Sequence, residues 1–295
     1  MENMTARVSC FARAFHFKNN VEWVFKDNAA DKILTETEYN VIAMNMTKGI
    51  NYFAPDFRGS EDEALRFIVD HNLSPTVLIR SAFCERAFEN EEALGCRQYV
   101  LFAGGYDLFA VRCKKEINVF ELDKAALIED KKSRISNNGF AMICNVSYVA
   151  CDLSDEGWSD SLGDRGFKSD ERAFGSLLGI SYYLPKEAFK KLISRISKLW
   201  SKGSAICFDY PVYENGEEFN KNQELAAAAN EPMQAKYSYK EMEILLQECG
   251  FLISEDYDSQ DATREFCEKY NANNPKHKIV APIGVRYCLA IKNEE

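Results

Sequence analysis

One short apolar run in the sequence ends in a turn of small residues, Ala103-Gly104-Gly105, and Asp107 follows two residues later. Glycine has no Cβ, so the backbone of such a turn can lie directly against a ligand. A helix after the turn would present free amide groups and the positive end of its dipole. The full G-x-G-x-x-G pattern of dinucleotide-binding proteins is absent, because Leu108 and Phe109 stand where its last glycine would be. A plain strand-to-helix turn therefore remains an alternative.

Acidic residues end the next two apolar runs. Glu121 and Asp123 close the second run, and Asp152-Leu153 closes the third. A carboxylate at the second position commonly accepts hydrogen bonds from the hydroxyls of an adenosine ribose, and we expect only one of the two acids to reach it. At the third position, a carboxylate can accept from the exocyclic amine of adenine while the next backbone N–H donates to a ring nitrogen. The three positions together predict an adenosine-containing ligand.

The apolar runs that position these residues alternate with helical patterns, which predicts an α/β fold with an open, mainly parallel sheet and helices on both faces. In such a sheet ligands bind at the carboxyl ends of the strands, where the chain order reverses. The predicted strands are Gln98–Gly104, Ile117–Asp123, Ser147–Leu153, Phe174–Pro185, Ser204–Pro211, Phe251–Asp256 and Val285–Ile291, and the predicted helices between them are Lys124–Ile135, Lys186–Leu199 and one ending at Gly250.

The N-terminal part of the chain has helical spacing of its apolar residues to about Asp70. The spacing predicts a first helix that runs through Val24 and Phe25, a second over Glu61–His71, and a third over Ser81–Leu94 after a turn at Ser74-Pro75. We expect residues 1–76 to form a helical cap, residues 77–295 to form the ligand-binding domain, and residues 211–236 to form a lid-like insertion after the fifth strand.

Composition excludes several classes of partner. The 36 Lys and Arg against 46 Asp and Glu give a formal charge of −10, which repels nucleic acid. The ten cysteines form no C-x-x-C pair, and there are three histidines, so the sequence predicts reduced thiols and no metal site. No run is long enough to span a bilayer, and the N-terminus lacks the apolar segment of a signal peptide. We expect a cytoplasmic protein without nucleic-acid or membrane partners.

Several motifs occur together in an order that resembles one family. They are an arginine-serine pair (Arg80-Ser81), the segment Tyr99–Arg112 around the small-residue turn, the acids Glu121 and Asp123, Asp152-Leu153 followed by Trp158, Tyr183-Leu184-Pro185 before a helix, and Gly203-Ser204 before a strand. This set resembles the leucine carboxyl methyltransferase family, and within it the bacterial branch of S-adenosylmethionine-dependent O-methyltransferases. The resemblance runs from about Thr5 to Ile291. It implies a Rossmann-like class I methyltransferase fold with a seven-stranded sheet.

The resemblance implies roles for individual residues of a bound S-adenosylmethionine. It assigns Arg80 to the carboxylate of the methionine portion, a pairing that suits a planar guanidinium. It places the backbone of Ala103, Gly104 and Gly105, with Asp107 beside it, against the cofactor. It assigns the ribose to Asp123, with Glu121 as its neighbour, and adenine to Asp152 and Leu153.

The chain departs from the family pattern at two positions. The first glycine of the turn is Ala103 here, a small residue that should still permit close approach. Leu178 stands where relatives carry a glutamate that contacts the cofactor. The N-terminal basic contact of the family falls on either Arg7 or Arg13, and the sequence does not decide between them.

The expected reaction transfers a methyl group to an oxygen, a carboxylate or hydroxyl, of a small molecule or peptide, and leaves S-adenosylhomocysteine. A carboxylate acceptor needs no general base, whereas a hydroxyl acceptor would need one. The candidates for that role or for binding the acceptor are His16, Tyr182, Tyr183 and Tyr210. Two alternatives remain open: a nicotinamide-dependent oxidoreductase, which Asp107 disfavours by repelling phosphates, and a non-catalytic relative that acts through protein contacts.

Overall fold

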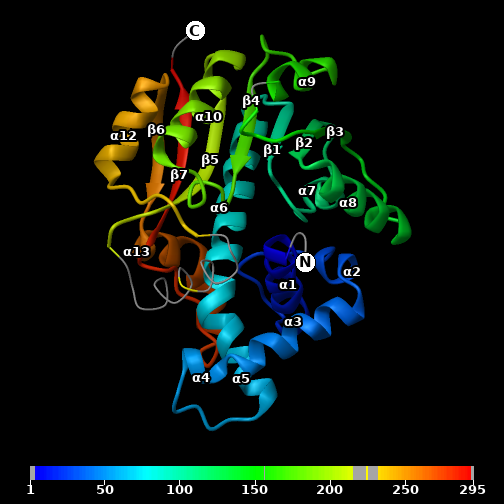
Figure 1. Ribbon diagram of the computed structural model, residues 1–295, viewed down its shortest axis with the longest axis vertical. Coiled ribbons are helices and arrows are strands. Elements are labelled where there is room, and N and C mark those ends of the chain that lie inside the picture. The colour runs from blue at the N-terminus through cyan, green and yellow to red at the C-terminus, as the bar shows by residue number, and fades with distance from the viewer. Residues whose placement is uncertain (1–3, 156, 215–223, 225–231, 294–295) are drawn as a thin grey trace.

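A twisted seven-stranded sheet forms the centre of the protein (Figure 1). The computed structural model describes residues 4–155, 157–214, 224 and 232–293. The strands are β1 (Gln98–Phe102), β2 (Asn118–Asp123), β3 (Asn145–Ala150), β4 (Ala173–Leu177), β5 (Ala205–Pro211), β6 (Phe251–Tyr257) and β7 (Val285–Lys292).

The strand order is β3-β2-β1-β4-β5-β7-β6, and only β7 pairs antiparallel with its neighbours in this sheet. The chain order reverses at β1, which has β2 on one side and β4 on the other. The carboxyl end of β1 is therefore the point where a ligand is expected to bind. The predicted α/β fold with a mainly parallel sheet is confirmed.

Helices cover both faces of the sheet, because alternate residues of the buried strands point to opposite sides. Leu101 of β1 lies in the core that contains residues of α6, whereas its neighbour Phe102 lies in the core that contains residues of α10 and α12. The helices are α6 (Ser74–Ala93), α7 (Phe109–Arg112), α8 (Ala125–Asn137), α9 (Trp158–Asp164), α10 (Lys186–Leu199), α12 (Tyr239–Glu248), α13 (Ser259–Ala262), η2 (Thr263–Cys267) and α14 (Glu268–Asn273).

The N-terminal helices gather beyond the carboxyl edge of the sheet, beside the lower half of the long helix α6 (Figure 1). They have their own apolar cluster. It contains Phe11 and Phe15 of the first helix, residues of α8, and Tyr106 and Leu108, which follow the turn Ala103-Gly104-Gly105 (the glycine turn). They are α1 (Met4–Asn19), α2 (Ala30–Ile33), α3 (Glu36–Lys48), α4 (Ile50–Phe53), α5 (Glu61–Ile68) and the π-helical turn η1 (Val69–Leu73).

Several predicted boundaries were wrong. The first helix ends at Asn19 rather than continuing through Phe25, and Val21 is 86% exposed, so its apolar spacing does not mark a buried helix face. Ser74-Pro75 is not a turn: α6 begins there directly after η1, and a proline in the first turn of a helix leaves no amide unpaired. The strand predicted over Phe174–Pro185 ends at Leu177, because the chain turns at Gly179 with a φ of 71°.

None of the helices in the described ranges is long and apolar enough to cross a lipid bilayer.

Candidate functional site

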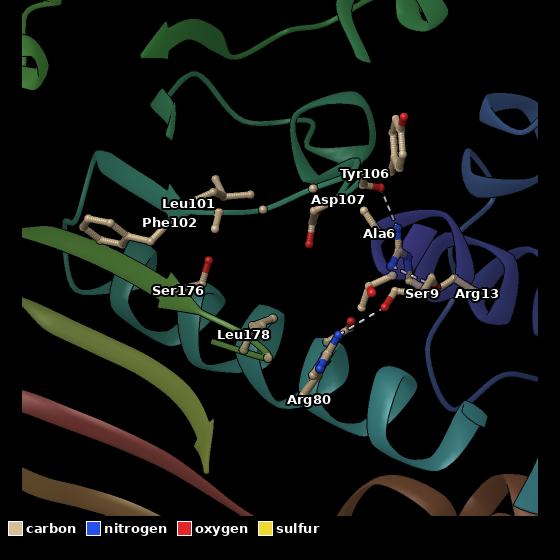
Figure 2. Close-up of a pocket in the computed structure, with 16 residues that line it drawn as sticks. Ala6, Ser9, Arg13, Arg80, Leu101, Phe102, Tyr106, Asp107, Ser176 and Leu178 are labelled. Carbon is tan, nitrogen blue, oxygen red and sulfur yellow. Dashed lines mark hydrogen bonds between the residues drawn. The ribbon is translucent and has the colours of Figure 1, made fainter. Parts of the chain in front are cut away.

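A cavity of about 150 Å³ lies at the carboxyl ends of β1 and β4, where the chain order reverses (Figure 2). Segments that are far apart in the sequence form its wall: the start of α1, the middle of α6, and the turns after β1 and β4. Its lining residues are Thr5, Ala6, Ser9, Arg13, Arg80, Ser81, Leu101, Phe102, Ala103, Gly104, Gly105, Tyr106, Asp107, Ser176, Leu178 and Gly179.

The turn after β1 brings its backbone against the N-terminal helix. Gly105 has a φ of 56°, and a Cβ at this position would lie 3.2 Å from the Cβ of Ala6. Ala103 has a φ of 48°, a left-handed conformation that costs a residue with a Cβ about 1 kcal/mol or more. The turn keeps this strained shape beside the cavity, which is common where a backbone must approach a ligand.

Asp123 holds the glycine turn from the neighbouring strand end. Its Oδ2 accepts a hydrogen bond from the Gly105 amide at 2.9 Å, and its Oδ1 accepts from the Lys124 amide at 2.8 Å. Each carboxylate oxygen can accept a further bond, and the side chain stays partly exposed. The carboxylate is therefore fixed in place at the edge of the sheet with acceptor capacity left.

Glu121 lies two residues earlier on β2 and is enclosed. Its side chain accepts a hydrogen bond from Lys131 Nζ of α8 at 2.6 Å, and both side chains are buried. Burial raises the pKa of Glu121 above its usual range. The structure therefore places Glu121 in an ion pair with α8 and leaves Asp123 as the acid of β2 at the ligand edge.

Asp107 lies at the mouth of the short helix α7 and lines the cavity. Its Oδ1 accepts a hydrogen bond from the Phe109 amide at 2.7 Å. The acidic side chain thus occupies the helix end that a phosphate group would need.

Arg13 lines the cavity from α1, but its donors are engaged by the protein. Its Nε donates to Asp27 Oδ2 at 2.8 Å, and its Nη2 donates to the Tyr106 carbonyl at 2.6 Å (Figure 2). Burial alone would raise the pKa of Asp27, but Arg112 and Arg13 outweigh it and hold that pKa below its usual range. Of the two arginines that the sequence left open, Arg13 reaches the cavity, whereas Arg7 lies 3.5 Å from Glu38 and does not line it.

Arg80 lines the cavity from α6, and its contacts with the protein are longer than those of Arg13. Its Nη2 lies 3.5 Å from Ser9 Oγ (Figure 2). Its Nη1 lies 3.6 Å from Asp209 Oδ2, behind the wall. Its side chain is 16% exposed. The guanidinium is enclosed, but its N–H groups make no short hydrogen bonds to the protein, so it is a candidate site for binding an anion.

Asp152 and Leu153 follow β3 and do not line the cavity. Asp152 is exposed and accepts hydrogen bonds from the Ser154 amide at 2.9 Å and the Ser154 hydroxyl at 2.5 Å, and these bonds lower its pKa. Because β1, β2 and β3 are adjacent and parallel, the glycine turn, Asp123 and Asp152 succeed one another along one edge of the sheet.

The four residues predicted to bind the acceptor lie outside the cavity wall. His16 is fully buried, and its Nε2 accepts a hydrogen bond from the Val24 amide at 3.0 Å. Burial and the charge of Arg66 lower its pKa to about 3, which is far from that of a base working near neutrality. The three tyrosines are held by the fold: Tyr182 donates to Asp209, Tyr210 donates to Asp256, and the Tyr183 carbonyl accepts from Gln234.

Sequence reasoning missed Thr5, Ser9 and Ser176 of the wall and Asp209 behind it. Only Asp209 had a signal, since it is a lone acid within the apolar run Ala205–Pro211, all of which is buried. The small hydroxyl residues have no such signal. No group of three or more His, Cys, Asp and Glu side chains that could hold a metal ion occurs among the described residues.

Comparison with known proteins identifies the family and the fold. Residues 6–197 match the family described as leucine carboxyl methyltransferase. The chain is 31% identical to YktD of Bacillus subtilis (strain 168), which its name describes as an S-adenosyl-L-methionine-dependent methyltransferase, over 98% of both chains.

Two solved structures share the fold. One is a DUF574 family protein from Streptomyces avermitilis, with a TM-score of 0.63, 13% identity, and coverage of 98% of this chain and 97% of that one. The other is a Thermobifida fusca protein described as a methyltransferase, with a TM-score of 0.56, 12% identity, and coverage of 84% and 94%.

Proposed function

The chain belongs to the leucine carboxyl methyltransferase family, and from this premise we propose that it transfers a methyl group from S-adenosylmethionine to an oxygen of a small molecule or peptide. The observation that carries the proposal is the cavity at the end of β1, which is lined by the strained glycine turn and by Arg80, an arginine without short hydrogen bonds. The carboxylate of Asp123 does not line this cavity but is hydrogen-bonded to the Gly105 amide of the same turn.

The donor set of this cavity suits the cofactor. Arg80 has N–H groups that make no short hydrogen bond within the protein, and a carboxylate can accept two hydrogen bonds from them in a bidentate pair. Asp123 has acceptor capacity for two vicinal hydroxyls at the next strand end. In this arrangement Arg80 would hold the carboxylate of the methionine portion, Asp123 would hold the ribose hydroxyls, and Asp152 and Leu153 would contact adenine.

The cofactor would supply a methyl group on a sulfonium, which is activated before it binds. The chain therefore has to align the acceptor oxygen with that methyl group and exclude water. Helix α1 helps to exclude water, because its first turns line the cavity and pack against the glycine turn at Gly105. Arg13 holds the helix there through the Tyr106 carbonyl.

The titratable side chains of the cavity wall favour a carboxylate acceptor. They are Arg13, Arg80, Tyr106 and Asp107, and the Tyr106 hydroxyl already donates to Asp130. None of these wall residues is a histidine, cysteine or lysine that could take a proton near neutral pH. A carboxylate oxygen is ionised at that pH and needs no base, so we place it ahead of a hydroxyl.

We also propose the division of the chain that the sequence suggested, with residues 1–76 as the cap and residues 77–295 as the methyltransferase domain. Most of the expected insertion, residues 211–236, lies outside the described residues.

The rival reading as a nicotinamide-dependent enzyme meets two obstacles. The helix after the glycine turn has only four residues, and Asp107 occupies its start. A pyrophosphate binds where a helix N-terminus offers amides without a competing negative charge.

Isothermal calorimetry of the full chain tests the proposal, with S-adenosylhomocysteine and NADH titrated separately. We expect binding of S-adenosylhomocysteine and none of NADH, and absence of the first at sub-millimolar concentration would refute the proposal. Asp123→Ala should weaken that binding while the protein stays folded. Incubation with methyl-labelled S-adenosylmethionine and a panel of carboxylates then separates an enzyme from a non-catalytic relative.

A further inference from the structure

Asp209 is a fully buried acid on β5 that lies behind the cavity wall and does not line it. Its Oδ1 accepts a hydrogen bond from the Gly179 amide at 2.7 Å, and its Oδ2 accepts from the Tyr182 hydroxyl at 2.8 Å. A buried carboxylate is costly unless its oxygens are satisfied, and two short hydrogen bonds, one to each oxygen, fix this one in orientation. The Asp209 carboxylate is therefore a rigid negative charge inside the fold.

This fixed charge lies beside Arg80, the arginine of the described cavity wall that makes no short hydrogen bonds to the protein. The distance from Asp209 Oδ2 to Arg80 Nη1 is 3.6 Å, which is an ion pair but longer than a hydrogen bond. In contrast, Arg13 makes bonds of 2.8 and 2.6 Å to its partners. The Asp209 carboxylate thus attracts the Arg80 guanidinium without consuming its N–H donors.

The turn after β4 leaves room for this arrangement. Gly179 has a φ of 71°, and a Cβ there would lie 2.6 Å from Arg80 Nη1. The guanidinium therefore occupies the space beside Gly179 that a side chain would fill, and the amide of the same residue donates to Asp209. Gly179 therefore contacts both Asp209, through its amide, and the Arg80 guanidinium.

We propose that Asp209 is a positioning residue that aims Arg80 at the carboxylate of the cofactor's amino-acid portion. This inference rests on the proposed function, since Arg80 must meet that carboxylate. The Tyr182 hydroxyl and the Gly179 amide hold Asp209, Asp209 holds Arg80, and Arg80 binds the ligand. The guanidinium then loses little conformational freedom when the ligand arrives, which is how preorganisation increases affinity.

The test compares two ligands on the full chain. S-adenosylhomocysteine has the amino-acid portion, whereas 5′-methylthioadenosine has the same adenosine and thioether but no carboxylate. Asp209→Asn removes the charge and keeps an oxygen for Gly179 or Tyr182. Calorimetry should show S-adenosylhomocysteine bound about tenfold more weakly by this variant, with the affinity for 5′-methylthioadenosine unchanged.

The chain offers a matched control on the next strands. Asp256 is a buried acid that accepts from the Tyr210 hydroxyl at 2.8 Å and pairs with Arg286, so it repeats the tyrosine, acid and arginine set away from the cavity wall. Asp256→Asn should change thermal stability and leave the affinities for both ligands unchanged.

The outcomes are distinct. Equal weakening of both ligands by Asp209→Asn, or no change in either, overturns the role of Asp209. If the unaltered protein binds neither ligand, the proposed function fails, and this inference fails with it. If Asp209→Asn does not fold, Tyr182→Phe replaces it in the test, because this variant keeps the charge of Asp209 but removes one of the hydrogen bonds that fix its position. We expect Tyr182→Phe to bind S-adenosylhomocysteine about threefold more weakly and 5′-methylthioadenosine with unchanged affinity. Equal effects on the two affinities would overturn the inference.

Discussion

Two sets of a tyrosine, an aspartate and an arginine meet at neighbouring residues of β5. The site triad consists of Tyr182, Asp209 and Arg80, and the edge triad consists of Tyr210, Asp256 and Arg286. Asp209 and Tyr210 are adjacent on the strand, so their side chains point to opposite faces of the sheet.

The two triads have the same chemistry but different geometry. In the edge triad, Arg286 Nε donates directly to Asp256 Oδ1, and the Tyr210 hydroxyl donates to Asp256 Oδ2. In the site triad, the tyrosine bond is equally short at 2.8 Å, but the arginine stays 3.6 Å from the acid. In the edge triad the arginine donates a short hydrogen bond to the acid. In the site triad Arg80 makes no short hydrogen bond to Asp209, so its N–H groups can donate to a third group. Residue type alone does not distinguish the two.

Removing the arginines should produce the largest contrast. Arg80→Ala should weaken S-adenosylhomocysteine binding about a hundredfold, because the ligand carboxylate loses a bidentate charged partner. Arg286→Ala should leave binding unchanged and lower the melting temperature, since it leaves Asp256 buried without its cation. Calorimetry and thermal unfolding of both variants measure this, and equal binding losses would contradict the distinction between the triads.

Gly179→Ala should produce the next effect. The added Cβ would lie 2.6 Å from Arg80 Nη1, so the guanidinium must move, and we expect S-adenosylhomocysteine to bind about tenfold more weakly. The positive φ should also lower the free energy of unfolding by about 1 kcal/mol. Gly139→Ala is the matched control, because Gly139 has a φ of 62° and no atom near its added Cβ. It should lose similar stability without any change in binding.

His16 is a third buried group, and it is hydrogen-bonded within the fold away from the cavity wall. Its substitution should have the smallest effect on S-adenosylhomocysteine binding. Burial lowers the pKa of the folded protein's His16 from 6.5 to about 3, so between these values the unfolded chain binds a proton that the folded chain does not. The free energy of unfolding should therefore fall as the pH falls from about 6.5 toward about 3, by about 1.4 kcal/mol per pH unit at the steepest.

His16→Gln should flatten this pH dependence and leave S-adenosylhomocysteine binding at pH 7.5 unchanged. Urea unfolding across the pH range and calorimetry at one pH measure the two effects. A loss of methyl transfer to the carboxylate panel, with stability and S-adenosylhomocysteine binding unchanged, would instead favour the role in acceptor binding that the sequence suggested for His16.

The part of the fold that local pattern describes was predictable. The buried runs of β1, β2 and β5, and the bounds of α10 at Lys186–Leu199, follow from apolar spacing and from Pro185. The errors fall where local pattern has no tertiary information, as at Ser74-Pro75, where the chain continues as helix because η1 leads directly into α6.

The candidate site divides in the same way. The glycine turn and Asp123 stand out in the sequence because each ends a buried strand, and parallel strands bring their carboxyl ends together. Arg80 was identified only through the family resemblance. The roles predicted for these residues, and for Asp152 and Leu153, remain predictions that the titrations above test.

By itself the sequence determined the strand and helix order, the acidic surface charge, and the small and acidic residues at successive strand ends, because all of these are properties of consecutive residues. Only the tertiary structure decided which charged groups are free to act. Arg13 and Arg80 are the same residue type on the same cavity, yet one is saturated by Asp27 and the Tyr106 carbonyl and the other is held at a distance by Asp209. Their partners lie up to 129 positions away in the chain (209 − 80), and pairings over that separation are fixed by the packing of α1, α6 and β5 rather than by local pattern.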